Sequence, residues 1–271
     1  MAKTVFITGA SSGIGKATAK YFHTMGWNVA ATMRNPTAEK ELGKLPNVKL
    51  LKVDVKEDQD IENALENAIA TFGKIDVLVN NAGYGTVGPF EGATESQLRE
   101  QFEVNVFGLM KVTKIFLKYF RPLQEGIIIN ISSLGGRVTI PLYSLYFSTK
   151  WAVEGFTESL RYELRPFNIS VKLIEPGATQ TDFAHRSQVV LRPVYTDDYI
   201  SYVEKVRLRT KKTAKNNNSN PNIVAKTIFR AATDGKRKLR YPCAGGAKTV
   251  LFLRAILGYH LFTWTVRKTM E

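Results

Sequence analysis

The sequence predicts a single α/β domain built on a doubly wound parallel sheet with helices on both faces. Short runs rich in valine, isoleucine and leucine alternate along the chain with longer stretches of helical periodicity. A strand that leads through a helix to the next strand returns parallel to the first, so this alternation predicts a parallel sheet. The runs are apolar throughout, which is typical of strands buried on both sides. The length of 271 residues suits one large domain, 1–271, and no linker divides it.

Seven apolar runs are the expected strands, and helical patterns lie between them. We expect strands at 4–8, 28–33, 48–55, 75–80, 126–132, 169–175 and 238–242. We expect helices at 13–25, 37–45, 57–72, 94–120, 146–165, 198–213 and 221–234. Gly26 and Gly235 follow two of these helices and favour their ends, while Pro221 favours the start of the last one.

Two segments depart from this alternation. Residues 183–220 are polar and basic and end in a run of asparagines, so we expect an insertion that covers the substrate as a lid, and the alternative is a rigid surface excursion without a role. Residues from about 245 to 271 form a C-terminal extension with many large apolar side chains. We expect these side chains to pack over the substrate or against another subunit, and the alternative is a helix lying on anionic lipid. No run of 18 uncharged apolar residues occurs, so no membrane span is expected.

The positive charge is concentrated in the last third of the chain. The net charge is +14, and residues 183–271 alone hold 18 lysines and arginines against five acids. Such a charge is often only a solvated surface, and its alternative is attraction to a phosphorylated or CoA-linked substrate or to anionic lipid. No nucleic-acid-binding motif accompanies the charge, so a nucleic-acid partner is not expected.

The N-terminus, the cysteine and the histidines add three further expectations. Met1 leads almost directly into an apolar strand without a secretory signal pattern, so we expect a cytoplasmic protein. The single cysteine, Cys243, excludes an internal disulfide and is expected to pack as a small apolar residue. His23, His185 and His260 show no ligand spacing, so no metal site is expected.

A glycine-rich loop follows the first expected strand. The segment Thr8-Gly9-Ala10-Ser11-Ser12-Gly13-Ile14-Gly15 separates this strand from a helix. Glycines let the backbone turn tightly and approach a pyrophosphate, and the helix N-terminus offers unpaired N–H groups to the anion. Glycine triplets also occur in ordinary turns, so the spacing alone is weak. Its place at the first strand-to-helix junction indicates a dinucleotide-binding loop.

A tyrosine and a lysine lie four residues apart in a later helix. Tyr146 and Lys150 share one helix face, and a nearby cation stabilises a phenolate and lowers its pKa from about 10. Tyr143 has Phe147 at the same spacing and lacks such a partner. An isolated pair of this kind is more often exposed to solvent, but the glycine loop upstream and Ser133, thirteen residues before Tyr146, favour a role in proton transfer.

Six motifs occur in order along residues 3 to about 182. They are Thr8-Gly9-x-x-x-Gly13-x-Gly15, Asn80-Asn81-Ala82-Gly83, Asn105, Ser133, Tyr146-x-x-x-Lys150, and Pro176-Gly177 with Thr181. Together they resemble the short-chain dehydrogenase/reductase family, which implies a Rossmann-type sheet of seven strands. The tract Thr4–Arg34 and the long C-terminal extension most resemble the branch with retinol-type, 17β-hydroxysteroid-type and acyl-dihydroxyacetone-phosphate-type enzymes. This similarity implies a bulky apolar substrate, such as a retinoid-, steroid- or lipid-like ketone or aldehyde.

The resemblance also implies roles for the catalytic residues. Tyr146 is the general acid in reduction and the general base in oxidation. Lys150 lowers the pKa of Tyr146 and binds the nicotinamide ribose. Ser133 binds the substrate oxygen, and the thirteen-residue spacing favours it over Ser132. Asn105 holds a water in a proton relay to Lys150, and its alternative role is that of a helix-interior asparagine bonded to the backbone.

The end of the second strand predicts NADP rather than NAD. NAD-binding sites place an acid there for the ribose hydroxyls, but the strand ends Ala31-Thr32-Met33-Arg34-Asn35 without one. Arg34 suits a 2′-phosphate, because a guanidinium forms two charge-assisted hydrogen bonds with it. Its alternative is an ordinary surface arginine. The residues expected to bind the cofactor are Thr8, Gly9, Ser11, Ser12, Gly13, Ile14, Gly15, Arg34, Asp54, Val55, Asn81, Ala82, Gly83, Tyr146, Lys150, Pro176, Gly177, Thr179 and Thr181.

These expectations combine into an NADP(H)-dependent oxidoreductase that moves a hydride between nicotinamide and a carbonyl or alcohol carbon. The alternative is a non-catalytic, nucleotide-sensing regulator on the same fold. A sensor needs only the cofactor loop, so the complete set of Asn105, Ser133, Tyr146 and Lys150 favours the enzyme. The expected helices at 94–120 and 146–165 are long and apolar, and by resemblance they pair with their copies in a homodimer or homotetramer.

Overall fold

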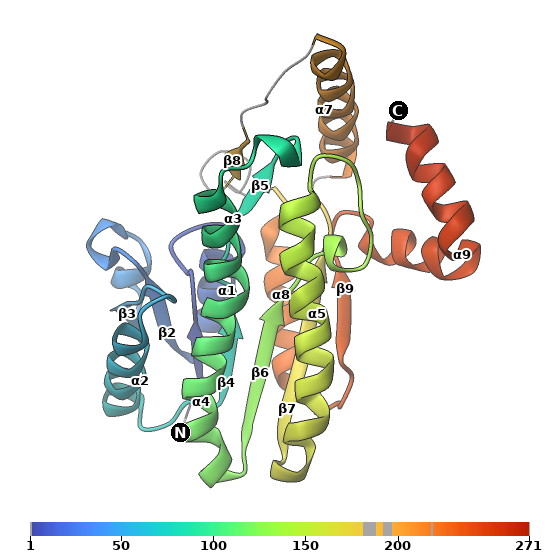
Figure 1. Ribbon diagram of the computed structural model, residues 1–271. Helices are drawn as coiled ribbons and strands as arrows, with labels where there is room; N and C mark the ends of the chain where they lie inside the picture. The colour runs from blue at the N-terminus through green and yellow to red at the C-terminus, as the bar shows by residue number, and fades with distance from the viewer. Residues whose placement is uncertain (1, 181–187, 192–196, 218, 271) are drawn as a thin grey trace.

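The structure is a computed structural model that describes residues 2–180, 188–191, 197–217 and 219–270. A sheet of seven parallel strands, in the order β3-β2-β1-β4-β6-β7-β9, forms its centre (Figure 1). The strands are β1 (Thr4–Ile7), β2 (Asn28–Met33), β3 (Val48–Lys52), β4 (Val77–Asn80), β6 (Gly126–Ile131), β7 (Ile169–Pro176) and β9 (Arg240–Cys243). Each expected apolar run overlaps one of these strands, although β7 and β9 each end one residue beyond the predicted run. The order turns outward from β1 in both directions, which confirms the predicted Rossmann-type doubly wound fold.

Helices cover both faces of the sheet. On one face α1 (Gly13–Thr24) packs beside α8 (Pro221–Thr233), and Phe22 and Ile228 lie in the core that they form with the sheet. On the other face lie α2 (Asp58–Phe72), α4 (Leu109–Leu123) and α5 (Ser144–Leu164), whose apolar residues form the second core with β4 and β6 (Figure 1). The central strands β1 and β4 are therefore buried along their whole length, as their continuous apolar sequences require, whereas the edge strand β3 is partly exposed.

The prediction of a helix at 37–45 is wrong. This segment instead contains two short 3₁₀ turns, η1 (Pro36–Ala38) and η2 (Leu42–Lys44). The Glu39 carboxylate accepts hydrogen bonds from the backbone N–H groups of Glu41, at 2.8 Å, and Leu42, at 3.1 Å. These bonds turn the chain out of a helical path, because side-chain bonds to nearby backbone compete with the helix.

The single helix expected at 94–120 is divided into three parts. It consists of α3 (Glu95–Phe102), a π-helical turn η4 (Glu103–Gly108), and α4. Thr94 begins α3 with a capping box, in which its hydroxyl accepts from Gln97 N–H and the Gln97 side chain accepts from Thr94 N–H. The π turn contains Asn105, and such turns are common at functional sites.

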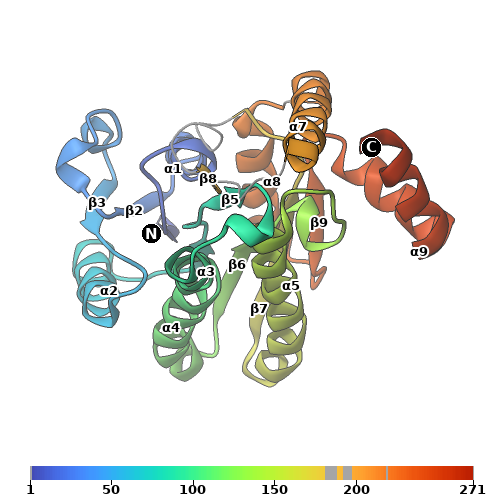
Figure 2. The same ribbon diagram turned by 45° about the horizontal axis from the view of Figure 1, so that its top comes forward.

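Additional elements lie above the carboxyl ends of the strands. A second small sheet pairs β5 (Gly85–Val87) with β8 (Gln188–Val190), and α7 (Asp197–Asn217) stands beside it (Figure 2). The expected insertion at 183–220 therefore includes a strand and a long helix. Residues 181–187, 192–196 and 218 lie outside the described residues, as does His185, and the lid function stays a prediction.

The C-terminal extension forms α9 (Ala247–Met270), which projects beyond the β9 edge of the sheet (Figures 1 and 2). Among the described residues it is the one helix long and apolar enough to cross a membrane by length and composition, with a mean hydropathy of 1.3 in its most apolar window. This corrects the expectation that no segment qualifies, because the basic residues are too few to lower the hydropathy. The expectation that its apolar side chains pack over the substrate or against another subunit stays a prediction. Phe262, Val266 and Met270 line the cleft described below, whereas Phe252 and Ile256 are exposed.

Candidate active site

The candidate site is a cleft at the carboxyl ends of the parallel strands. Its volume of about 2110 Å³ exceeds the roughly 300–1,000 Å³ typical of a small-ligand pocket, so it has room for a dinucleotide and a second molecule. Most of the expected site residues line it: Gly9, Ser11, Ser12, Gly13, Ile14, Arg34, Asp54, Val55, Asn81, Ala82, Gly83, Ser133, Tyr146, Lys150, Pro176, Gly177 and Thr179. Thr8, Gly15 and Asn105 lie behind this lining, and Thr181 lies outside the described residues.

The glycine loop leaves its backbone open to a ligand. Gly9 has a φ of +66°, and a Cβ there would lie 2.8 Å from the Cα of Ala82, so only glycine fits. A Cβ at Gly15 would lie 2.5 Å from the Asn81 side-chain nitrogen. Ser12 precedes α1 in an extended conformation, and its side chain makes no capping hydrogen bond. The N–H groups of the first turn of α1 are thus available to an anion, and this cradle fits a pyrophosphate.

Thr8 and Asn81 fix the glycine loop to the neighbouring strand end. The Thr8 hydroxyl accepts hydrogen bonds from the backbone N–H groups of Asn81 and Ala82, both at 3.0 Å. In return, the Asn81 side-chain amide donates to the carbonyl oxygens of Thr8 and Gly9, both at 3.0 Å. The loops after β1 and β4 are therefore held as one rigid wall of the cleft.

Arg34 and Asp54 mark the far end of the cleft, at the ends of β2 and β3. Arg34 is exposed, lines the cleft, and has no ion-pair partner among the described residues. The Asp54 carboxylate accepts from the backbone N–H of Lys56 at 3.0 Å, which shapes the turn before α2. Val55 is buried beside it, against Gly108. The guanidinium is thus free to meet a ligand phosphate, while Asp54 is held by its own turn.

Asn105 is buried in the π turn, and both ends of its side chain are hydrogen-bonded. Its Oδ1 accepts from the backbone N–H of Tyr84 at 3.0 Å, and its Nδ2 donates to the Tyr84 carbonyl at 2.8 Å and to Thr149 Oγ1 at 3.1 Å. These bonds join Tyr84, between β4 and β5, to α5, the helix that contains Tyr146 and Lys150. The side chain braces the site, and its expected role in a water relay stays a prediction.

Tyr146, Lys150 and Ser133 come together at the centre of the cleft. Ser133 ends the loop after β6, where its hydroxyl accepts from the backbone N–H of Gly135 at 3.0 Å and interacts with the Tyr146 phenol. The Lys150 Nζ lies 5.8 Å from the centre of the Tyr146 ring and donates to the carbonyl of Ile131 at 2.9 Å. One hydroxyl, one phenol and one ammonium therefore face the same space.

Burial shifts the pKa of both the tyrosine and the lysine. Burial raises the pKa of the Tyr146 phenol to about 12, and the Ser133 hydroxyl opposes this rise. Burial lowers the pKa of the Lys150 ammonium to about 8, and the charge of Glu154 opposes this fall. The expected lowering of the Tyr146 pKa by Lys150 is not found, because burial of the phenolate and the nearby Tyr143 raise this pKa and only the Ser133 hydrogen bond opposes the rise. Tyr146 therefore keeps its proton at neutral pH, as a general acid must.

A buried ionic network behind Lys150 was not predicted from the sequence. Glu154, one helical turn after Lys150, accepts from Arg240 Nε at 3.2 Å. Glu175 pairs with Arg137 at 3.2 Å and with Arg240 at 3.4 Å. Burial raises the pKa of both carboxyls, that of Glu175 to about 7. Glu154 could have been found from the sequence, because it lies four residues after Lys150 on the same inward face of the helix. Its partners Arg137 and Arg240 are distant in sequence and leave no such pattern.

The segment after β7 closes the cleft opposite the glycine loop. The backbone N–H of Gly177 donates to the carbonyl of Cys243 at 2.9 Å, and a Cβ at Gly177 would lie 2.6 Å from the carbonyl oxygen of Gly245. The Thr179 hydroxyl donates to the Gly177 carbonyl at 2.9 Å. Cys243 is buried, and burial raises the pKa of its thiol to about 11, so it is no thiolate nucleophile at neutral pH. Among the described residues no group of three or more histidine, cysteine, aspartate or glutamate side chains could hold a metal ion.

Comparison with known proteins places this geometry in a family. Residues 3–189 match the family model described as short chain dehydrogenase. An uncharacterized oxidoreductase of Schizosaccharomyces pombe is 39% identical over 88% of this chain and 99% of that protein. The 3-ketodihydrosphingosine reductase of Bacteroides thetaiotaomicron is 40% identical over 72% of this chain and 71% of that protein. A short-chain dehydrogenase from Streptomyces avermitilis has a similar solved structure, with a TM-score of 0.81 and 33% identity over 94% of both chains.

Solved structures of similar fold contain nicotinamide cofactors of both kinds. ElxO with bound NADP is 25% identical, with a TM-score of 0.75, and covers 92% of this chain and all of that one. A 3-ketoacyl-(acyl-carrier-protein) reductase from Brucella melitensis, complexed with NADH, is also 25% identical, with a TM-score of 0.76 over 90% of this chain and 98% of that one. These neighbours support a nicotinamide cofactor without deciding between the two.

Proposed function

This chain belongs to the short-chain dehydrogenase family, and we propose that it uses NADP(H) to interconvert a carbonyl compound and its alcohol. One observation carries the proposal: the Ser133 hydroxyl, the Tyr146 phenol and the Lys150 ammonium face one space beside the cofactor-binding loop. Bound NADPH supplies the hydride, and the residues of the chain supply binding, orientation and the proton.

The residues would act on the substrate oxygen in sequence. The Ser133 hydroxyl donates a hydrogen bond to the carbonyl oxygen and stabilises the negative charge that develops there. The Tyr146 phenol, which is protonated at neutral pH, then delivers its proton to this oxygen. The charged Lys150 ammonium stabilises the phenolate that remains. In oxidation the same groups act in reverse, with Tyr146 as the base.

Preference for NADP over NAD is the first finer part of the proposal. The exposed Arg34 guanidinium, which has no ion-pair partner in the part of the chain that the structure describes, supports it, because a 2′-phosphate can accept two charge-assisted hydrogen bonds from it. Lys16 and Lys20, which line the same end of the cleft, pair with Glu41 at 2.9 and 2.5 Å. Their charges are partly balanced, so Arg34 is the group that decides the preference.

A bulky apolar substrate is the second finer part. Apolar side chains line the cleft near Tyr146, among them Leu134, Val138, Ile140, Leu142 and Phe262. The similarity to a protein named 3-ketodihydrosphingosine reductase supports a lipid-like ketone. The volume of about 2110 Å³ leaves room for such a chain beside a dinucleotide.

The test is NADPH oxidation across a panel of retinoid, steroid and long-chain keto-lipid substrates, with short aldehydes and ketones included. We expect the long apolar ketones to be reduced, and Tyr146→Phe to abolish their turnover. NADPH binding without turnover of any carbonyl would favour the alternative, a nucleotide-sensing regulator.

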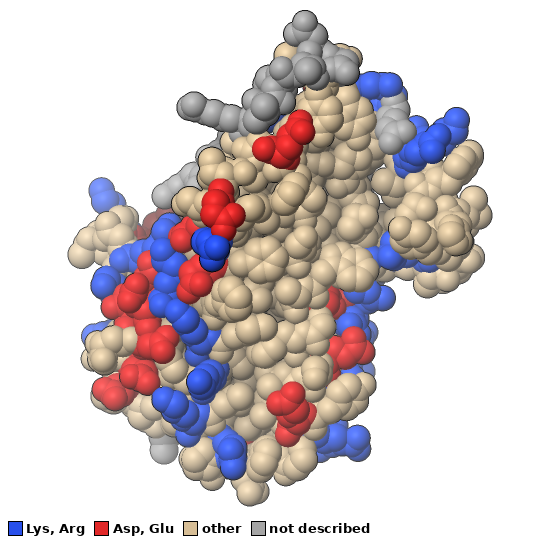
Figure 3. Space-filling view, in the orientation of Figure 1, with Lys and Arg blue, Asp and Glu red and all other residues tan. Residues whose placement is uncertain are grey.

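Self-association and a cytoplasmic location are also proposed. Large side chains on the outer faces of η4 and α5 are exposed, among them Phe107 and Tyr162, and a wide area without charged residues covers the centre of the molecule (Figure 3). This surface supports a homodimer or homotetramer that pairs these helices with their copies.

A further inference from the structure

The outer surface of α9 combines large apolar side chains with positive charge. Phe252 and Ile256, 63% and 65% exposed, lie one turn apart and point away from the body of the molecule. Leu261 and Trp264 continue this surface in the second half of the helix. The lobe formed by α9 shows lysine and arginine at its margins and no acidic side chain on the face seen in Figure 3. Apolar side chains gathered in this way mark a binding surface.

A sharp bend divides α9 into two arms, each too short to cross a membrane. Gly258 has φ 66° and ψ −177°, a conformation open to glycine alone, and it divides α9 into residues 247–257 and 259–270. Each arm is about 17 Å long at 1.5 Å per residue, whereas a bilayer core is about 30 Å thick. Arg254 holds the bend, because its guanidinium lies 6.0 Å from the Tyr259 ring and 5.5 Å from the Phe262 ring.

The charge of this surface favours an anionic partner over a second copy of the chain. Residues 247–270 contain four basic residues and no acid. Lys248, Arg267 and Lys268 among them are exposed, and Lys268 lies 6.0 Å from the Trp264 ring. Two such surfaces placed face to face would repel each other. Tryptophan beside lysine and arginine is the composition of helices that lie in the headgroup region of anionic membranes.

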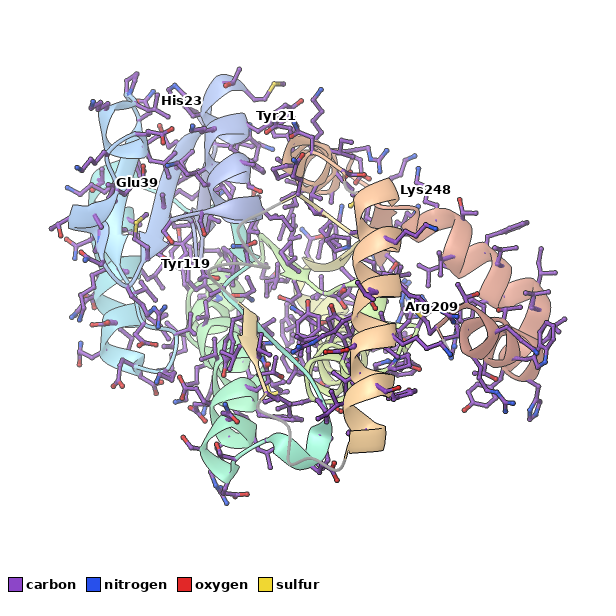
Figure 4. The ribbon with its side chains drawn as sticks, turned by 90° about the horizontal axis from the view of Figure 1, so that it is seen from above. Tyr21, His23, Glu39, Tyr119, Arg209 and Lys248 are labelled. Carbon is purple, nitrogen blue, oxygen red and sulfur yellow. The ribbon has the colours of Figure 1, made fainter. Side chains whose placement is uncertain are left out.

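The opposite side of α9 lines the catalytic cleft. Phe262, Val266 and Met270 in the second arm belong to the same cleft wall as Tyr146. Arg209 on α7 donates to the carbonyl of Thr269 at 3.2 Å and ties this arm to the elements above the site (Figure 4). One helix, about 10 Å thick, therefore separates the exposed apolar surface from the cleft.

We propose that α9 binds the surface of an anionic membrane and that the apolar substrate enters the cleft from this membrane, beside the second arm. The binding step stands independently of the reaction. The entry step rests on the proposed function, since it requires a carbonyl substrate that dissolves in lipid.

Binding is tested by sedimentation of the full chain with vesicles of phosphatidylcholine alone and of phosphatidylcholine with phosphatidylserine. We expect at least about tenfold tighter binding to the anionic vesicles at low salt, since each cation near such a surface contributes about fivefold. High salt should reduce this difference, and the tryptophan fluorescence should shift to shorter wavelength on binding in the wild type but not in Trp264→Phe.

The variants compare exposed apolar sites on α9 with similar sites elsewhere. Ile256→Asp with Trp264→Asp should weaken vesicle binding at least about tenfold, because both side chains are exposed and would be immersed in the membrane. Met25→Asp with Ile223→Asp, at sites 47% and 46% exposed, is the matched control and should bind as the wild type does. Equal binding by both double variants, or no binding of the wild type to anionic vesicles, overturns the proposal. If the wild type binds no vesicles but has a larger mass in solution than the Ile256→Asp/Trp264→Asp variant, the surface binds a second copy of the chain instead.

Entry from the membrane is tested with two ketones, one long-chain and held in vesicles, the other short and water-soluble. The Ile256→Asp/Trp264→Asp variant should reduce the vesicle-held ketone at least about tenfold more slowly and the soluble ketone at the wild-type rate. Equal loss on both ketones overturns the entry step. If the wild type reduces neither ketone, the proposed function fails, while the vesicle-binding result is unaffected.

Discussion

The pH dependence of reduction depends on the charge of Lys150. Proton donation by Tyr146 leaves a phenolate, and Lys150 stabilises this negative charge only when its ammonium is charged. Because burial lowers the pKa of Lys150 to about 8, the charged form predominates below that pH and is lost above it. The charged fraction falls from about nine tenths at pH 7 to about one tenth at pH 9. We therefore expect kcat/KM to fall about tenfold over this range.

The assay measures initial rates of NADPH oxidation at limiting NADPH and saturating ketone, because kcat/KM reports the pKa values of the free enzyme. Tyr146, with a pKa raised to about 12, stays protonated throughout and does not contribute to the fall. Lys150→Arg should be slower at pH 7, because the hydrogen bond to Ile131 is altered, but its profile should be flat, since a guanidinium keeps its charge. Glu154→Gln should move the fall to lower pH, because Glu154 raises the pKa of Lys150. A flat wild-type profile, or a fall that persists in Lys150→Arg, would refute this reasoning.

Four further predictions concern the cofactor preference, the general acid, a buried ion pair and the oligomeric state. Arg34→Asp should remove a preference for NADPH over NADH of about 10- to 100-fold in a fluorescence titration, and equal affinities in the wild type would contradict the role of Arg34. Tyr146→Phe should lower kcat by about 10²- to 10⁴-fold with NADPH affinity unchanged, whereas Tyr143→Phe should keep most activity; similar losses in both would show that the wrong acid was chosen. Lys172→Met should lower the free energy of unfolding, measured by urea titration, by about 3 kcal/mol. The variant leaves Asp234, which pairs with Lys172 at 2.8 Å, without its buried countercharge. An unchanged urea midpoint would contradict a stabilising role of this ion pair. Light scattering at micromolar concentration should give the mass of a dimer or tetramer, and a monomer would exclude the proposed association.

The sheet was predictable from the sequence because burial on both faces leaves a clear pattern. The run at 126–132, Gly-Ile-Ile-Ile-Asn-Ile-Ser, became β6 almost residue for residue. Two helical expectations failed for local reasons that periodicity does not record. Glu39 bonds its own backbone and prevents a helix at 37–45, and the π turn around Asn105 depends on bonds to Tyr84 and Thr149 across the fold.

The site was predictable where it is made of local motifs and hidden where it is made of distant partners. The glycine loop and the pair Tyr146 and Lys150 each lie within a few residues. The network of Glu154 with Arg240, 86 residues later, has no local pattern. The partner of the α9 surface could not be predicted, because an apolar stripe specifies burial but not the partner that buries it, and within this chain nothing described covers Phe252 or Ile256.

Transfer of isotope from cofactor to product tests hydride transfer most directly. NADPH carrying deuterium at C4 of the nicotinamide, on one face at a time, is incubated with the chain and a long-chain apolar ketone, and the alcohol is analysed by mass spectrometry. The proposed reaction predicts one deuterium at the carbinol carbon from one of the two labelled cofactors, with labelled alcohol formed at least about 10²-fold more slowly by Tyr146→Phe. Oxidation of NADPH without label in an alcohol, or labelled alcohol from Tyr146→Phe at the wild-type rate, would contradict it.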